Sequence, residues 1–452
     1  MVTKSRQPNE RLREVIAETG IGYEAVARAV RRIAAENGEV LSTNKSAVAH
    51  WVAGTEPADR TAAYLAEALS RRCGRQMTRT QLGLREADSP TLAGAEPIGT
   101  AIVLGRADLE HRHHLAAATY TSVDIALPIG YDHEPVARML AARTGSNRVG
   151  DAEISIVHSI TSVFCAADEQ LGGGHGLSTV AAYLAETAAP MLTGRFANEG
   201  SRQRAFGSVS ELAWLLGWKH HDLGHEGAAQ KYYVLGFQLA VEADPHAHTA
   251  WMMRAIAQQA LSMKQPKHCA DLIDAALRRG RMYLDGATEA LLHITQARAH
   301  AATGNGPHVA RALLDAEDAL ARDGGEAQPS FSALAGPAGG TVDSHTARTL
   351  TAIGDHAGTE ARHRAAFSSW DPVQFPRVHM LTHADLGDCL AAQARADEAV
   401  ASWNTALDLA EGMSSGRGAA AMTSILPTLA YYRRRGVPGA SALDRRIREA
   451  DV

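Results

Sequence analysis

The chain has few cysteines, few aromatic residues and no long apolar segment, and each of these absences excludes a class of protein. Its four cysteines (Cys73, Cys165, Cys269 and Cys389) are far apart and include no Cys-x-x-Cys pair, which argues against a disulfide framework and a zinc knuckle. No apolar run reaches the roughly 18 residues that a membrane-spanning helix needs. The N-terminus alternates basic and acidic residues instead of showing a signal-peptide pattern. We therefore expect a cytoplasmic protein with no membrane partner.

Aromatic residues make up only 5% of the 452 residues, alanine is the commonest residue, and runs of Val, Ile, Phe or Tyr long enough for strands are rare. Such a composition favours helix over nearly the whole chain, and the length provides for two or three domains. We therefore predict an all-α fold. The sequence has no Ser-centred nucleophile elbow, no evident Cys–His pair and no P-loop lysine. No enzymatic activity and no cofactor are expected.

The most informative segment lies between residues 44 and 57 and is predicted to form one short helix. Asn44 can cap its first turn, because the side-chain oxygen accepts the free N–H groups there. Val48, Trp51 and Val52 recur at helical spacing and give one face an apolar stripe. Gly54 supplies a left-handed stop. Val48, Trp51 and Gly54 are therefore expected to be structural residues of this helix.

The opposite face of this helix is small, polar and cationic. A helix with a buried tryptophan behind such a face is suited to be a recognition helix, whose first residues reach base edges in the major groove of DNA. We predict base contacts from Lys45, Ser46 and His50 and contact between Ala49 and a thymine methyl group, with Asn44 beside a phosphate.

Helical apolar patterns on both sides of this segment supply a scaffold for it. They cover residues 9–19, 23–37, 59–73 and 78–86, so that residues 1–86 are predicted to form a five-helix domain. This arrangement resembles the helix-turn-helix domain of Xre-type repressors. The connection over residues 34–43 is longer than the tight turn of that family, which leaves the angle between the second and third helices open. A helical bundle that only docks to another protein remains the alternative.

Charge separates this first domain from the rest of the chain. Residues 1–86 hold 14 Lys and Arg against 10 Asp and Glu, whereas the remaining residues hold 31 against 40. Phosphate contacts supply most of the non-specific affinity for DNA, so a DNA-binding domain is expected to be locally basic. The predicted phosphate contacts are Arg28, Arg32 and Arg60, with Arg31, Arg71, Arg72 and Arg75 as further candidates. An ordinary solvated surface also explains any single one of them.

Beyond residue 200, segments of helix length echo one another. Leu216-Gly217 is followed by Ala229, Tyr233 and Gly236, and Leu386-Gly387 is followed at the same offsets by Ala399, Trp403 and Ala406. This small–small–aromatic–small order is typical of tetratricopeptide repeats, in which small residues let paired helices approach and the aromatic ring fills the gap between pairs. Weaker copies cover residues 250–279, 288–322 and 346–370. We predict a solenoid with a concave surface; a run of unrelated amphipathic helices is the alternative.

Two other groups of residues have the composition of a chemical site. The glycine run at residues 172–176 lacks the lysine of a P-loop and a preceding strand, so it indicates a turn between helices. His221 and His225 are spaced to share a metal ion, beside His220 and Asp222, but they fall in the turn of the clearest repeat. We expect turn and cap roles there and no metal site; a metal-dependent hydrolase would require one.

Several short stretches carry a likeness to a known family. They are Val48, Trp51, Gly54 and Pro57, Gly172–His175, Tyr183–Leu192, Gly217-Trp218 with Asp222, and Ala228–Tyr233. Together they resemble an actinobacterial family of cytoplasmic regulators in which an Xre-type helix-turn-helix domain precedes a tetratricopeptide-like domain. The resemblance implies transcriptional control through a signal that the repeats read.

The predicted organisation is a DNA-binding domain at residues 1–86, a linker at 87–105, a helical connecting region at 106–200 and the repeats at 201–452. We predict a sequence-specific DNA-binding regulator that binds a double-stranded operator as a homodimer, because one helix-turn-helix unit buries little surface. Its repeats are expected to dimerise and to hold a peptide, a small molecule or a protein signal in their concave surface. The alternative is a tetratricopeptide scaffold for protein interaction whose head binds no DNA.

Overall fold

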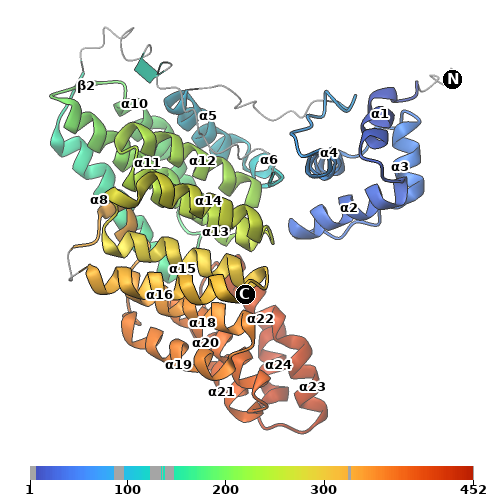
Figure 1. Cartoon of the computed structure of the whole chain (residues 1–452), viewed down its shortest axis with the longest axis vertical. Helices are drawn as coiled ribbons and strands as arrows, with labels where there is room; N and C mark the ends of the chain where they lie inside the picture. Colours follow the sequence, from blue (N-terminus) through green and yellow to red (C-terminus); the bar gives the residue numbers. More distant parts are fainter. Residues whose placement is uncertain are drawn as a thin grey trace.

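The described part of the chain is folded predominantly into α-helices, as its composition predicts (Figure 1). The computed structural model describes residues 7–85, 96–122, 134, 136–137, 147–323 and 327–450. A two-stranded parallel sheet joins β1 (Arg148–Val149) to β2 (Arg195–Phe196). Within the described ranges, no helix combines the length and the apolar character that crossing a bilayer requires.

The N-terminal part, called the head here, spans residues 7–85 and contains α1 (Glu10–Glu18), α2 (Tyr23–Glu36), α3 (Lys45–Val52) and α4 (Asp59–Cys73). Asparagine side chains begin two of these helices. Asn9 accepts the N–H of Leu12, and Asn44 accepts the N–H of Ala47, both at 3.0 Å. Each bond satisfies a donor that the first turn leaves free, so the cap predicted at Asn44 is confirmed.

The apolar stripes of these four helices meet in a core of their own. Leu12, Val30, Val48, Trp51 and Leu65 are among its members, and each is less than 10% exposed. Helices as short as these are marginal in isolation and are stabilised by burying such stripes. The head core is separate from the two hydrophobic clusters of the remaining chain.

The fifth helix predicted at residues 78–86 is wrong. Residues 79–83 form a single turn, in which Leu82 N donates to Thr78 O at 3.1 Å and Leu84 N donates to Arg79 O at 2.9 Å. The turn ends at Gly83, whose φ of +66° lies outside the right-handed helical region. Both leucines are nevertheless buried in the head core. The spacing of the two leucines correctly predicts that they are buried, but it does not distinguish a turn from a helix.

The rest of the chain, called the body here, is built mainly from helix pairs. The pairs are α11 (Glu199–Asp222) with α12 (Glu226–Ala243), α13 (Ala247–Ser262) with α14 (Pro266–Gly280), α15 (Gly286–Ala302) with α16 (Gly306–Arg322), α18 (Ala338–Ile353) with α19 (His356–Ser369), and α20 (Pro376–Ala392) with α21 (Ala396–Ala410). Their short connections make the partners antiparallel. Between pairs lie the 3-10 turn η2 (Arg281–Tyr283) and α17 (Ser330–Ala333), and the row ends with α22 (Gly416–Ser424), α23 (Leu426–Arg434) and α24 (Ala440–Glu449).

The segment before the first pair belongs to the body and is not a connecting region. It contains α5 (Pro97–Glu110), α6 (Arg112–Ala116), α8 (Asp151–Leu171), α9 (Leu177–Tyr183), the π-helical turn η1 (Leu184–Ala188) and α10 (Ala189–Met191). Buried residues of α5, α9 and α11, such as Leu104, Ala181 and Leu212, share one core. The linker predicted at 87–105 is wrong from residue 97, where α5 begins; residues 87–95 lie outside the described part.

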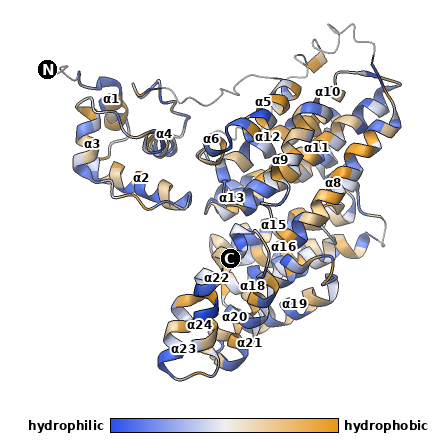
Figure 2. Ribbon diagram, turned by 180° about the vertical axis from the view of Figure 1, so that it is seen from behind, coloured by the Kyte–Doolittle hydropathy of each residue, from blue (hydrophilic) through white to orange (hydrophobic). Residues whose placement is uncertain are grey.

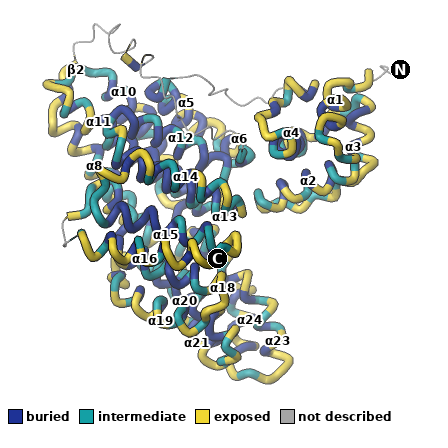
Figure 3. The backbone as a smooth tube through the Cα atoms, viewed as in Figure 1, coloured by how far each residue is buried: buried dark blue, intermediate teal, exposed yellow. Residues whose placement is uncertain are grey.

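Burial follows this pairing. In Figure 3 the dark blue of buried residues is concentrated on α11, α12, α13 and α15, whereas the head helices show long exposed faces. Figure 2 shows many hydrophobic residues along α11 and α12 of the body. The body therefore contains the larger core, to which α5 and α9 contribute.

Glycines permit the close approach that the matching offsets predict. A Cβ added at Gly217 of α11 would lie 2.5 Å from the ring of Tyr233 on α12, and one added at Gly387 of α20 would collide with Trp403 of α21. One added at Gly236 would lie 2.7 Å from Met252 on α13, the next pair. In both copies the glycine thus meets the aromatic ring of the partner helix in its own pair, whereas the sequence placed that ring in the gap between successive pairs.

We predict that Gly387→Ala destabilises the body although alanine favours helix. The added methyl group must displace the Trp403 ring, and overpacking of this kind costs about 1–3 kcal/mol. Gly339→Ala on α18 is the matched control, because a Cβ added there would have no other atom within 4 Å; it should be neutral or stabilise by up to about 1 kcal/mol. Urea unfolding followed by circular dichroism measures both. Equal midpoints for the two variants would contradict the close approach.

Candidate functional site

The face of α3 that the sequence marks as a recognition surface is exposed. Asn44, Lys45, Ser46, Ala49 and His50 are all exposed to solvent, whereas the structural residues Val48 and Trp51 are 0% and 7% exposed. Gly54, with φ of +96°, follows the end of the helix as predicted. In Figure 1, α3 lies on the side of the head that is turned away from the body. The geometry thus leaves this face accessible to a large partner.

The three predicted phosphate contacts are exposed, but two of them have a carboxylate partner. Arg32 Nε lies 3.8 Å from Glu36, and Arg60 forms an ion pair with Glu39. Arg28 has no hydrogen bond or ion pair within the described ranges. Solvent-exposed pairs contribute only about 0–1 kcal/mol, so a phosphate can replace Glu39 at Arg60 at little cost; at Arg32, Glu36 is 9% exposed but keeps Arg71 as its partner when Arg32 turns to a phosphate.

Two further candidates, Arg71 and Arg31, make contacts within the head; burial contradicts the prediction of phosphate contact for Arg71, and that for Arg31 stays a prediction. Arg71 is 11% exposed at its side chain and pairs with Glu36 at 2.7 Å and with Glu67 at 2.5 Å. Arg31 donates to the carbonyl of Thr43 and so fixes the connection between α2 and α3. Glu67 lies one turn before Arg71 on α4, whereas Glu36 and Thr43 come from other segments, which the local sequence does not reveal.

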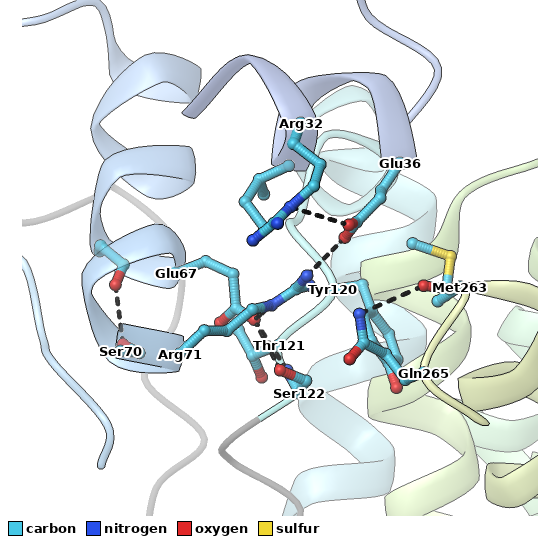
Figure 4. Close-up of polar contacts among 12 residues, drawn as sticks. Arg32, Glu36, Glu67, Ser70, Arg71, Tyr120, Thr121, Ser122, Met263 and Gln265 are labelled. Atoms are coloured by element: carbon cyan, nitrogen blue, oxygen red, sulfur yellow. Dashed lines mark hydrogen bonds and ion pairs between the residues drawn. The ribbon is translucent and has the colours of Figure 1, made fainter. Parts of the chain in front are cut away.

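A second candidate site is the joint between head and body (Figure 4). It is formed by residues 120–122, which follow α6, together with α4 of the head and α12 of the body. The Glu67 carboxylate of α4 accepts the Ser122 N–H at 2.9 Å and the Ser122 hydroxyl at 3.1 Å. On the other side, Gln230 of α12 accepts the Thr121 N–H at 2.9 Å and donates to the Thr121 carbonyl at 2.7 Å. Three consecutive residues thereby tie the head to the body.

Burial raises the pKa of two side chains in this joint. Burial raises the pKa of Glu67, and the Ser122 N–H and the Arg71 guanidinium oppose that rise. Tyr120 is fully buried between head and body, and burial raises its pKa well above the ordinary value. Gly227 lets the segment approach α12, because a Cβ there would collide with the carbonyl of Ala118. No local pattern in the sequence indicates these contacts, which join residues far apart in the chain.

A third group of polar residues is buried inside the body. Asp168 of α8 accepts from Lys219 Nζ of α11 at 3.0 Å and from Arg377 of α20 at 2.6 Å. Arg377 also reaches Glu169 at 2.5 Å and lies 3.5 Å from Asp222. Burial alone would raise the pKa of Asp168, but Arg377 and Lys219 hold it below its ordinary value. We call these five residues the buried ion cluster.

The glycine run and the histidines that the sequence singles out surround this cluster. Residues 172–176 form the predicted turn, and Gly173 N donates to Asp222 at 2.9 Å. His220 bonds Asp108 at 2.8 Å, and His221 bonds Glu226 at 2.9 Å. These side chains pair with carboxylates of different elements. Among the residues that the structure describes, no group of His, Cys, Asp and Glu is arranged to hold a metal ion.

A cavity of about 160 Å³ lies among the inner helices of the body. Its lining comes chiefly from α8, α11, α13, α15, α18 and α20, with Arg417 of α22 at one side. It is bounded in part by the buried ion cluster. Four tryptophans line it: Trp214, Trp218, Trp251 and Trp370.

Comparison with known proteins bears on the head. A family model described as the SP15 N-terminal domain matches residues 12–85. These bounds nearly coincide with the head core, which runs from Leu12 to Leu84. The match covers a minor part of the chain and indicates that the head is a unit by itself. No curated protein matches the chain.

We predict that Arg377→Met strongly destabilises the body. The substitution leaves Asp168, Glu169 and Asp222 buried without their shared cation, and breaking a buried pair in this way costs about 3–5 kcal/mol. The control is Arg364→Met, because the Arg364–Glu360 pair lies at the surface and contributes about 0–1 kcal/mol. Urea unfolding distinguishes the two, and equal losses would show that the cluster is not the stabilising element inferred here.

We also predict that Glu67→Ala opens the head side of the joint. Without its acceptor, the Ser122 amide should exchange its hydrogen about tenfold faster or more, since a hydrogen bond to a charged group contributes about 1.5–3 kcal/mol. The Thr121 amide, bonded to Gln230, should keep its wild-type rate. Hydrogen exchange at single-amide resolution measures both, with Glu14→Ala on the exposed side of α1 as control. Unchanged exchange at Ser122 would mean that the body alone holds the segment.

Proposed function

We propose that this protein is a sequence-specific DNA-binding transcriptional regulator with a helix-turn-helix head and a tetratricopeptide-like solenoid as its body. The observation that carries the proposal is the division of α3 into a buried apolar back and an exposed front of small, polar and cationic side chains. A recognition helix needs this division, because its back must be fixed while its front enters the major groove.

The contacts follow from the positions of the exposed side chains. Lys45, Ser46 and His50 read base edges, Ala49 contacts a thymine methyl group, and Asn44 lies beside a phosphate. Arg28, Arg32 and Arg60 contact the DNA backbone. One head offers a small surface, so we propose that two copies of the chain bind a two-fold operator.

The body is proposed to dimerise and to read the signal. Its row of helix pairs and the matched contacts of Gly217 and Gly387 with aromatic rings support a tetratricopeptide-like architecture, which typically offers a concave binding surface. The proposed protein acts in the cytoplasm and catalyses no reaction. The actinobacterial regulators that the sequence resembles combine the same two parts.

The first turn of α12 offers a physical link between signal and head. His221 and Gln259 line the cavity, and both bond Glu226 at the start of α12, at 2.9 and 2.8 Å. Gln230, one helical turn later, holds Thr121 of the joint. A ligand that moves α12 therefore acts on the placement of the head, and DNA must change the affinity for that ligand by the same factor.

The test is DNA selection followed by a gel shift. Fragments of chromosomal DNA retained by the protein are sequenced, and the enriched site is compared with scrambled DNA at several salt concentrations. We expect a shift that weakens with salt yet prefers the enriched site. Replacing Lys45 and His50 together with alanine should remove the preference and leave the helical content unchanged.

The matched control replaces Lys267 and His308, which are of the same residue types and exposed on the body. This control should bind the enriched site as the wild type does. Retained preference in the Lys45/His50 variant would contradict the assignment of the recognition helix. No enrichment of any site would instead favour a scaffold for protein interaction with a head that does not bind DNA.

A further inference from the structure

The cavity of the body carries more positive than negative charge. Its lining includes Arg254, Arg298, Arg348, Arg377 and Arg417 but, as acidic residues, Asp168 and Glu169. Both carboxylates pair with Arg377, and Arg348 pairs with Asp385 at 2.8 Å. Within the described ranges, Arg254, Arg298 and Arg417 form no ion pair with a carboxylate.

Arg254 is held rigidly on α13 although it has no counterion. It is 3% exposed, and its guanidinium lies 4.9 Å from the ring centroid of Trp251. Its Nε donates to the carbonyl of Leu291 at 2.9 Å and to Thr295 Oγ1 at 3.2 Å. Burial, and after it the charge of Arg298, lowers the pKa of Arg254 to about 9, so the group stays charged at neutral pH.

Arg298 and Arg417 approach the same space from α15 and α22. Arg298 has no hydrogen bond or ion pair in the described part of the chain, and burial together with Arg348 lowers its pKa to about 10. The Arg417 guanidinium lies 5.0 Å from the ring centroid of Trp218. The charges converge: after burial, Arg298, Arg254, Arg348 and Arg417 all lower the pKa of His345.

Such convergence costs stability unless an anion balances it. Like charges repel more strongly in an interior that water screens poorly than at a surface. In the neighbouring buried ion cluster, Lys219 and Arg377 are paired with carboxylates and so stabilise the fold. Unpaired arginines, whose planar guanidiniums bind carboxylate and phosphate through paired hydrogen bonds, are therefore available to a ligand.

Tryptophans supply the apolar part of the site. Four of the six tryptophans of the chain line the cavity, and Nε1 of Trp370 is buried with no acceptor in the described residues. Indole faces stack on flat rings. On the same measure a water molecule needs about 10–15 Å³, so 160 Å³ holds on the order of ten waters. This room suits a small molecule better than a peptide.

We propose that the cavity bounded by Arg254, Arg298 and Arg417 binds a small organic anion in which a phosphate or carboxylate group is attached to a flat ring. The guanidiniums hold the anionic group and the indoles hold the ring. This proposal rests on the signal-reading role given to the body under the proposed function and names the class of its signal. Its test requires no DNA.

The experiment measures binding of four probes to the full chain by isothermal titration calorimetry. Phenyl phosphate and phenylacetate contain both parts and differ in the anionic group, so their comparison separates phosphate from carboxylate. Inorganic phosphate lacks the ring, and benzyl alcohol lacks the charge. We expect one of the two aromatic anions to bind at least about tenfold more tightly than inorganic phosphate and benzyl alcohol, a difference of about 1.4 kcal/mol.

Arg298 provides the decisive variant because it forms no hydrogen bond or ion pair with the residues that the structure describes. Arg298→Gln should weaken binding of the preferred probe at least about tenfold, and Arg298→Lys should weaken it less, because the charge remains but the planar fork is lost. Without ligand, Arg298→Gln should melt at a temperature no lower than the wild type, since it removes repulsion. Arg311→Gln, at the surface of α16 and paired with Asp315, should bind as the wild type does.

Two results would overturn the proposal. One is the absence of tighter binding by either aromatic anion at millimolar concentration. The other is a lower melting temperature of Arg298→Gln than of Arg311→Gln, with binding unchanged, which would give Arg298 a structural role. A protein that binds the probe through Arg298 but enriches no DNA site would keep this inference and contradict the proposed regulator.

Discussion

The fold depends on the pairing of a buried carboxylate with cations from distant parts of the chain. Asp168 on α8 meets Lys219, 51 residues later, and Arg377, 209 residues later. A buried charge without a partner is very costly, so a stable structure must bring α8, α11 and α20 together. The cluster thereby joins α8, which precedes the helix pairs, to the first pair through α11 and to the fifth pair through α20. The cavity forms among the helices that this cluster connects.

Arg377 and Arg298 show how differently the same side chain is used within one cavity wall. Arg377 meets three carboxylates and connects distant helices, whereas Arg298 is held by none that the structure describes. Composition does not separate the two, since each is one arginine in a helix. The two arginines differ in their partners. Arg377 is paired with carboxylates and stabilises the fold, whereas Arg298 has no carboxylate partner that the structure describes and remains available to an anion.

Local patterns in the sequence predict what depends on neighbours within about one or two helical turns. Asn44, Val48 and Trp51 of α3 belong to this class. The fifth head helix was wrong because burial of two leucines is compatible with a turn. The prediction of a linker at 87–105 was wrong from residue 97, because scattered glycines and prolines do not exclude a helix that begins at Pro97.

Contacts between distant residues escape such patterns, and the joint depends on them. Arg71 is basic and therefore suggests phosphate contact, yet Glu36 and Glu67 enclose it, and Glu67 in turn holds Ser122. The acceptor of the body side, Gln230, lies one turn from Glu226, which the cavity residues His221 and Gln259 hold. A shift of α12 can therefore be favoured or opposed from both the cavity and the head. Coupling between two sites requires such a shared element.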